Sequence, residues 1–124
     1  EPPKPFVLNP AEAIVAPLGR WNLYIGGGGC CVAGYVNIDL FVLPGVDVAA
    51  DAARLPFPDA TFDRIECDAV LEHVPNPATV MREIERALKP GGYAHIVTPF
   101  CHPYHEYPKD YQRFTLAGLE ELAR

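Results

Sequence analysis

Five short apolar runs separated by turn-forming residues stand out along the chain. They cover residues 21–25, 35–39, 46–49, 63–67 and 93–98. Apolar runs of about four to eight residues, bounded by Gly, Pro, Asn or Asp, are typical of buried strands. The pattern therefore predicts five strands at these positions.

A helical period follows the fourth run. Apolar side chains at Val80 and Ile84 recur at a spacing that places them on one helix face. Asn76 suits the N-cap position, and the Lys-Pro-Gly-Gly sequence at 89–92 is a typical stop signal. We therefore predict a helix over residues 76–88, followed by the fifth strand.

Further helix signals lie near both ends of the chain. Asn9, with a proline directly after it, is typical of a helix start, and Pro17 ends that helix. Thr115 caps a final helix with a leucine-rich apolar face. We expect residues 1–20 to form a lead-in with a short helix and residues 21–124 to form the domain.

Strands that alternate with helices predict an α/β domain with a mostly parallel sheet, and ligands bind such sheets beyond the carboxyl ends of the strands. Here the glycines at 26–29 follow the first strand, Asp39 ends the second and Asp51 follows the third. Glycines let backbone N–H groups approach a ligand closely. Carboxylates accept hydrogen bonds from ribose hydroxyls or an adenine amino group. The pattern therefore predicts a nucleotide-like ligand.

The connection between the first two strands is short. Only eight residues, Gly27 to Gly34, lie between Gly26 and the second strand, whereas a crossover with a helix needs about 10 to 12. A dinucleotide's pyrophosphate relies on the N-terminus of that helix, so NAD is disfavoured. A cofactor with an amino acid tail and no phosphate, such as S-adenosylmethionine, fits better. The same short connection leaves open a hairpin with a long loop.

Composition narrows the class of protein. The chain has 124 residues and a net charge of −6, so it lacks the basic footprint of a nucleic-acid-binding surface. It has no apolar window of the length that a membrane span needs and no signal-peptide pattern at its start. We expect a cytoplasmic protein with no nucleic-acid or membrane partner.

Several sequence blocks occur in an order that is specific to one family. They are NLYIGGG at 22–28, AGYVNID at 33–39, DAARLPFPD at 51–59, VLEHV at 70–74 and LKPGG at 88–92. Together they resemble the class I S-adenosylmethionine-dependent methyltransferases, in particular a bacterial methyltransferase type 11-like subgroup with a shortened glycine loop. The loop at 99–115 is similar to the one after that family's fifth strand. The resemblance extends from about Asn22 to the C-terminus.

The resemblance implies a Rossmann-like three-layer sandwich with strand order 3-2-1-4-5, lacking the family's last strands because the chain ends at Arg124. It also implies S-adenosylmethionine as the cofactor, with the glycines on the methionine moiety, Asp39 on the ribose, Asp51 and Ala52 on the adenine, and residues after the fourth strand beside the sulfonium. The cofactor-binding residues are then Gly26, Gly27, Gly28, Asp39, Leu40, Asp51, Ala52, Asp68 and Leu71. Tyr24 stands where the family has an acid.

Methyl transfer to a small-molecule acceptor is the function that this resemblance implies. Alignment of the two reactants does most of the work in such a displacement. If the acceptor must lose a proton, His102, His105 or Asp110 are the candidate bases; the alternative is that they order their loop. The alternative function is a non-catalytic S-adenosylmethionine-binding module or scaffold. A nicotinamide dehydrogenase is a more distant candidate.

Metal binding and assembly are the remaining questions. Cys30, Cys31, Cys67 and Cys101 follow strands at one sheet edge, where a histidine could join them around zinc. No C-x-x-C pair supports this, so we expect buried thiols and assign no metal ligand.

We expect His73 to be a structural histidine that caps a short turn. With the last strands absent, the fifth strand is an edge, and such edges favour pairing into a homodimer.

The predicted helix over residues 76–88 also carries a charged cluster. Arg82, Glu83, Glu85 and Arg86 lie away from its apolar face. Charged side chains at such positions are normally exposed to water. We therefore expect a solvated helix face there.

Overall fold

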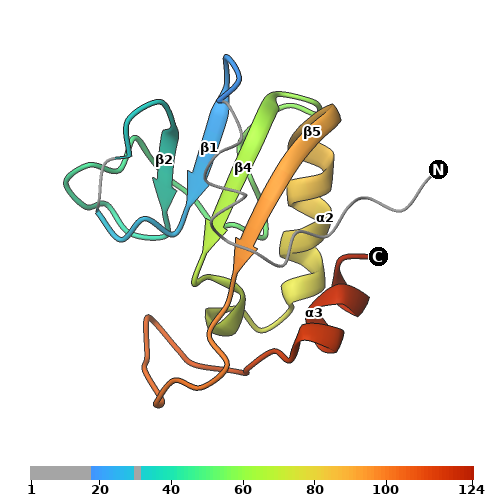
Figure 1. Cartoon of the computed structure of the whole chain (residues 1–124). Coiled ribbons are helices and arrows are strands. Elements are labelled where there is room, and N and C mark those ends of the chain that lie inside the picture. Colours follow the sequence, from blue (N-terminus) through green and yellow to red (C-terminus); the bar gives the residue numbers. More distant parts are fainter. Residues whose placement is uncertain (1–17, 30–31) are drawn as a thin grey trace.

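A single parallel sheet organises the molecule (Figure 1), which is a computed structural model that describes residues 18–29 and 32–124. Five strands are arranged in the order β3-β2-β1-β4-β5. Each neighbouring pair is parallel. This confirms the predicted fold class and strand order. It also excludes the hairpin alternative for the first two strands.

The strands are β1 (Asn22–Ile25), β2 (Val36–Asp39), β3 (Val48–Ala49), β4 (Phe62–Asp68) and β5 (Leu88–Val97); the helices are the 3-10 helix η1 (Leu71–His73), α2 (Pro77–Ala87) and α3 (Leu116–Leu122). The labelled strands point the same way, and η1 and the loop after β5 lie beyond their carboxyl ends (Figure 1). The chain therefore concentrates its longest loop and its glycine loop at one edge of the sheet.

The hydrophobic core lies between the sheet and α2. Leu23 of β1 and Ile65 and Cys67 of β4 are buried, and they belong to one cluster with Val80 and Ile84 of α2. Full burial of such a side chain stabilises the fold by about 1.5–3 kcal/mol relative to exposure. The apolar residues whose spacing predicts the helix therefore form the face of α2 that packs on the sheet.

The opposite face of the sheet carries a polar network. Arg64 and Glu66 are buried and hydrogen-bonded to each other. Glu66 also lies 2.7 Å from Nδ1 of His95 and accepts a hydrogen bond from the hydroxyl of Tyr35. Alternate residues of a strand face opposite sides, so β4 is apolar toward α2 and polar on its other side.

The start of β5 differs from the prediction. The strand begins at Leu88, directly after α2, and not at Tyr93. Leu88 pairs with Phe62 and Tyr93 pairs with Arg64, so the residues between them bulge out of the ladder. Gly91, at φ 78°, belongs to this bulge. The Lys-Pro-Gly-Gly sequence therefore ends the helix as predicted but interrupts a strand that has already started.

The helix ends agree in part with their signals. Thr115 caps α3, because its hydroxyl accepts a hydrogen bond from the N–H of Gly118. Asn76 stands at the N-cap of α2, but its side chain makes no capping hydrogen bond. The helix predicted to start at Asn9 lies outside the described residues. Within the described part of the chain, no helix has the length and apolar character to cross a membrane.

Candidate functional site

A cavity opens at the carboxyl edge of the sheet, which we call the glycine-loop cavity. Its lining comes from the loop after β1, the ends of β2 and β3, the segment after β4 and the loop after β5. The lining residues are Ile25, Gly26, Gly28, Asp39, Leu40, Ala50, Asp51, Ala52, Ala69, Val70, His73, Val74, Tyr107 and Pro108. Most of the predicted cofactor residues therefore meet at one cavity, although they come from separate parts of the chain.

Asp39 organises the glycine loop from the end of β2. One of its carboxylate oxygens accepts a hydrogen bond from the N–H of Gly28 at 3.1 Å, and the other accepts from the N–H of Phe41 at 3.3 Å. The residue is 7% exposed. Each oxygen keeps acceptor capacity beyond its one backbone bond. Asp39 therefore fixes the loop and is still able to accept a bond from a ligand in the cavity.

Asp51 marks the far side of the cavity. Its carboxylate accepts a hydrogen bond from the N–H of Ala53, and its carbonyl accepts from the N–H of Arg54. These two bonds form a turn in which the carboxylate is exposed and Ala52 is buried. The two acidic residues of the lining therefore have different surroundings, one buried at a strand end and one open to water.

The charged face of α2 is not simply solvated, which corrects the expectation for Glu83 and Arg86. Glu83 accepts a hydrogen bond from the N–H of Leu55 at 2.8 Å, and Arg86 donates to the carbonyl oxygens of Leu55 and Phe57. Arg86 also pairs with Asp59. The hydrogen bond from Arg86 holds the pKa of Glu83 below its usual value. The reason is that a turn-rich segment leaves backbone groups unpaired, and these two side chains supply the partners.

Three predicted cofactor residues, Gly27, Asp68 and Leu71, are not among the residues that line the cavity. Leu71 is fully buried in the core. Asp68 accepts a hydrogen bond from the hydroxyl of Tyr24 at 2.9 Å. Burial, together with this bond, raises the pKa of Tyr24. The structure thus places Leu71 in a packing role and ties Asp68 to the end of β1.

Ala69 and Val70 line the cavity in place of the predicted Asp68 and Leu71. Ala69 has a φ of 52°, in the left-handed region that non-glycine residues rarely adopt. Such a conformation costs of order 1–3 kcal/mol and is concentrated at functional sites. The strained turn after β4 is therefore a feature of the site that composition did not reveal.

A second hollow, which we call the histidine cavity, adjoins the first. It is lined by Ala69, Glu72, Val97, Thr98, Pro99, His102 and His105. Ala69 lines both cavities. Two of the predicted bases, His102 and His105, therefore line a hollow that shares Ala69 with the glycine-loop cavity.

The loop after β5 is held against η1. The N–H of Tyr111 donates to the carbonyl of Glu72 at 2.8 Å, and the side-chain amide of Gln112 donates to the carbonyl of Val74 at 3.1 Å. These bonds connect the two segments that line the histidine cavity. The same loop supplies Tyr107 to the glycine-loop cavity. The aromatic-rich composition of this loop is a sequence signal for that role.

Asp110, the third predicted base, has a structural position. Both of its oxygens accept hydrogen bonds from Arg113, and one also accepts from the N–H of His105. The Arg113 guanidinium and this backbone bond hold the pKa of Asp110 far below its usual value. A carboxylate with so low a pKa is a weak base. The geometry therefore favours the alternative that Asp110 orders the loop.

His73 does not cap its turn, which corrects that expectation. Its Nδ1 lies 2.7 Å from the carbonyl oxygen of Lys109, on the loop after β5. The side chain also lines the glycine-loop cavity. It therefore connects η1 to the loop and borders the candidate ligand space.

The described cysteines do not form a cluster. Cys67 is buried in the core and Cys101 is exposed. Burial raises the pKa of the Cys67 thiol, which disfavours the thiolate that a metal needs. Cys30 and Cys31 lie outside the described residues.

Comparison with known proteins supports a specific family. A family model described as a methyltransferase domain matches residues 36–96. The chain is 30% identical over 102 residues to the demethylmenaquinone methyltransferase of Mycobacterium tuberculosis, which covers 78% of this chain and 43% of that protein. It is 51% identical over 45 residues to a sterol 4-C-methyltransferase of Caenorhabditis elegans, over 36% of this chain and 14% of that protein. The chain thus spans less than half the length of these relatives.

Solved structures show the same fold. The [4+2]-cyclase SpnF aligns over 92% of this chain and 53% of its own, with a TM-score of 0.67 and 22% identity. An S-adenosylmethionine-dependent methyltransferase from Mesorhizobium loti aligns over 73% of this chain and 53% of its own, with a TM-score of 0.58 and 23% identity. At these identities the likeness concerns the fold.

Proposed function

Because the chain belongs to the class I S-adenosylmethionine-dependent methyltransferases, we propose that its glycine-loop cavity binds S-adenosylmethionine for methyl transfer to a small-molecule acceptor. The observation that carries this proposal is the charge of the lining. It contains the carboxylates of Asp39 and Asp51 and, among the described residues, neither lysine nor arginine. Such a lining suits a cationic sulfonium and a ribose better than a pyrophosphate.

The residues present fit this cofactor. Each carboxylate oxygen of Asp39 keeps a lone pair that can accept a hydrogen bond from a ribose hydroxyl. Asp51 and the N–H of Ala52 are available to an adenine edge. The glycine loop brings backbone close to the cavity without side chains. When bound, the sulfonium supplies a methyl carbon that is already activated for displacement.

The chain's own contribution to catalysis is then alignment. The glycine loop and Asp39 would hold the cofactor so that an acceptor could be aligned with its activated methyl group. Holding the two reactants in this geometry accounts for much of the rate in such reactions. The histidine cavity, on the other side of Ala69, is the space in which we place the acceptor.

The proposal is tested with methyl-labelled S-adenosylmethionine and a mixture of small-molecule metabolites. We expect label in one or a few small molecules, with an equal amount of S-adenosylhomocysteine. Asp39→Asn should abolish transfer, because it removes the charge and half the acceptor capacity at the ribose position. Asp63→Asn, at the opposite end of β4, is the matched control and should retain it.

A non-catalytic binding module is the second candidate function. The fold neighbour SpnF is described as a [4+2]-cyclase, so this fold does not by itself establish methyl transfer. Binding of S-adenosylmethionine without transfer to any acceptor would favour this candidate. Binding of NAD in its place would contradict both.

A further inference from the structure

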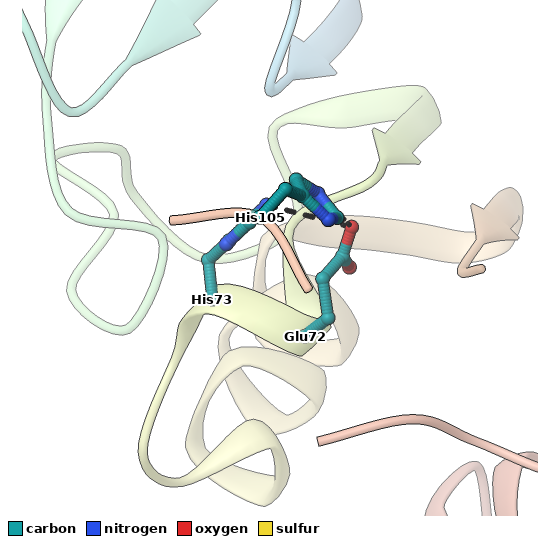
Figure 2. Close-up of side chains that lie close together, drawn as sticks. All are labelled: Glu72, His73 and His105. Atoms are coloured by element: carbon teal, nitrogen blue, oxygen red, sulfur yellow. Dashed lines mark ion pairs between the residues drawn. The ribbon is translucent and has the colours of Figure 1, made fainter. Parts of the chain in front are cut away.

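Three potential metal ligands converge beside the histidine cavity (Figure 2). Glu72 and His73 project from η1, and His105 reaches toward them from the loop after β5. The ligand atoms of the three side chains all lie within 4.8 Å of one another. This arrangement is made by the fold, because the loop that carries His105 is held against η1.

Glu72 is an unusual residue in this position. It is 0% exposed. Among the described residues, neither of its carboxylate oxygens has a hydrogen-bond partner. A buried carboxylate without hydrogen bonds is costly, so such groups are normally paired with a cation or bound to a metal. A positive charge between Glu72 and its neighbours would therefore stabilise the site.

When their rings are neutral, the two histidines present acceptors to Glu72 rather than donors. Nδ1 of His73 lies 2.7 Å from the carbonyl of Lys109, and Nδ1 of His105 lies 3.3 Å from the carbonyl of Pro103. A carbonyl oxygen only accepts, so each Nδ1 carries the hydrogen. In the neutral ring, each Nε2 then holds a lone pair. Nδ1 bonds of this kind, to a backbone carbonyl, are typical of histidines whose other nitrogen binds a metal.

The distances suit a small divalent cation. Oε1 of Glu72 lies 3.6 Å from Nε2 of His73 and 4.0 Å from Nε2 of His105. Tetrahedral ligands at about 2.0–2.1 Å from zinc lie about 3.3 Å apart, so both carboxylate-to-imidazole distances are within about 1 Å of the separation in a zinc site. We propose that Glu72, His73 and His105 form a binding site for one divalent transition-metal ion of the zinc type.

Three protein ligands leave a coordination position open, as in catalytic rather than structural zinc sites. Glu72 and His105 line the histidine cavity, so the open position faces the space in which we place the acceptor. This role rests on the proposed function. There the ion would bind an acceptor hydroxyl, whose proton leaves to water. Its oxygen would then attack the methyl carbon as the C–S bond breaks toward sulfur.

Metal binding is tested without any methyl transfer, so its failure is distinct from failure of the proposed function. The metal-free full chain is titrated with Co²⁺, followed by competition with Zn²⁺. We expect one equivalent of Co²⁺ with visible ligand-field bands and no thiolate-to-cobalt band. Glu72→Gln and His105→Ala should each weaken binding by roughly 100-fold. His102→Ala is the matched control, since its ring lies 4.4 Å from His105 but outside the cluster, and it should retain wild-type affinity.

Thermal unfolding of the metal-free variants checks the fold and the rival explanation. Glu72→Gln keeps the side chain's shape and removes an unpaired buried charge, so its midpoint should equal or exceed that of the wild type. Zn²⁺ should then raise the midpoint of the wild type and not that of Glu72→Gln. Absence of stoichiometric binding, or binding unaffected by Glu72→Gln, would overturn the proposal. A lower midpoint for Glu72→Gln without any Zn²⁺ effect would show that protonated histidines balance Glu72 instead.

Discussion

Substitution of two glycines in one loop provides a matched test of the site's geometry. Gly26 and Gly28 both have positive φ angles, of 88° and 58°. A Cβ at Gly26 would lie 2.4 Å from Cγ2 of Val70 and 2.5 Å from the carbonyl oxygen of Asp68, whereas a Cβ at Gly28 would meet nothing within 4 Å. The two substitutions therefore share the backbone strain and differ in the steric contact.

The expected magnitudes follow from these contacts. The left-handed conformation costs an L-residue about 1–2 kcal/mol, and the lower entropy of the unfolded alanine chain offsets about 0.4–1 kcal/mol of this. Gly28→Ala should therefore destabilise the domain by roughly 1 kcal/mol. At Gly26, the backbone oxygen cannot rotate away, and such overpacking adds about 1–3 kcal/mol. Gly26→Ala should thus be the more destabilising by about 2 kcal/mol.

Urea unfolding, followed by the fluorescence of the chain's one tryptophan, Trp21, measures the difference. If the two variants are unfolded by heat instead, the same 2 kcal/mol corresponds to a difference of about 8 °C in the thermal midpoint of a domain of this size. Equal costs for the two variants, or a larger cost for Gly28→Ala, would refute the close approach of the glycine loop to the end of β4. The measurement needs no ligand, so it tests the architecture alone.

Three further predictions concern stability and assembly. Glu83→Gln should lower the free energy of unfolding at neutral pH, while Glu120→Gln, at an exposed position of α3, should not. The folded-state pKa of Glu83 is depressed, so the ionised side chain stabilises the fold above the usual carboxyl pKa. This stabilisation should disappear as the pH falls below about 4.5. Denaturant titrations at several pH values measure it. Tyr24→Phe should cost about 1 kcal/mol through the lost bond to Asp68, and no change in the unfolding midpoint would contradict that bond. Since β5 is an edge strand of the described sheet, we expect a homodimer by light scattering, and a strictly monomeric mass would refute it.

The sheet was predictable because its strands are marked in the chain by local signals. The apolar runs of β1, β2 and β4 end in glycine, acid or turn residues, and the resemblance to a family then supplied the strand order. The start of β5 was not predictable in the same way. Leu88 continues the apolar period of α2 and also pairs with Phe62, so one residue satisfies both patterns, and only the tertiary pairing decides between them.

The residues that line the two cavities were predictable only in part. Asp39 and Asp51 follow strands, and the rule that ligands bind at strand ends placed them correctly at one cavity. Tyr107 and the cluster of Glu72 with His105 depend on how a long loop folds back over η1, which no local pattern encodes. Arg86 was misjudged for the same reason, since its partners lie in a loop far away in the sequence.

Ligand-dependent thermal unfolding tests the central claim most directly. The chain is heated alone and with S-adenosylmethionine, S-adenosylhomocysteine or NAD. Saturation at about 100 times the dissociation constant should add about 2.7 kcal/mol to the free energy of unfolding. We predict a rise in the midpoint with the two sulfur compounds, no rise with NAD, and loss of the effect in Asp39→Ala. No shift with either sulfur compound, or a shift with NAD alone, would contradict the assignment of the glycine-loop cavity.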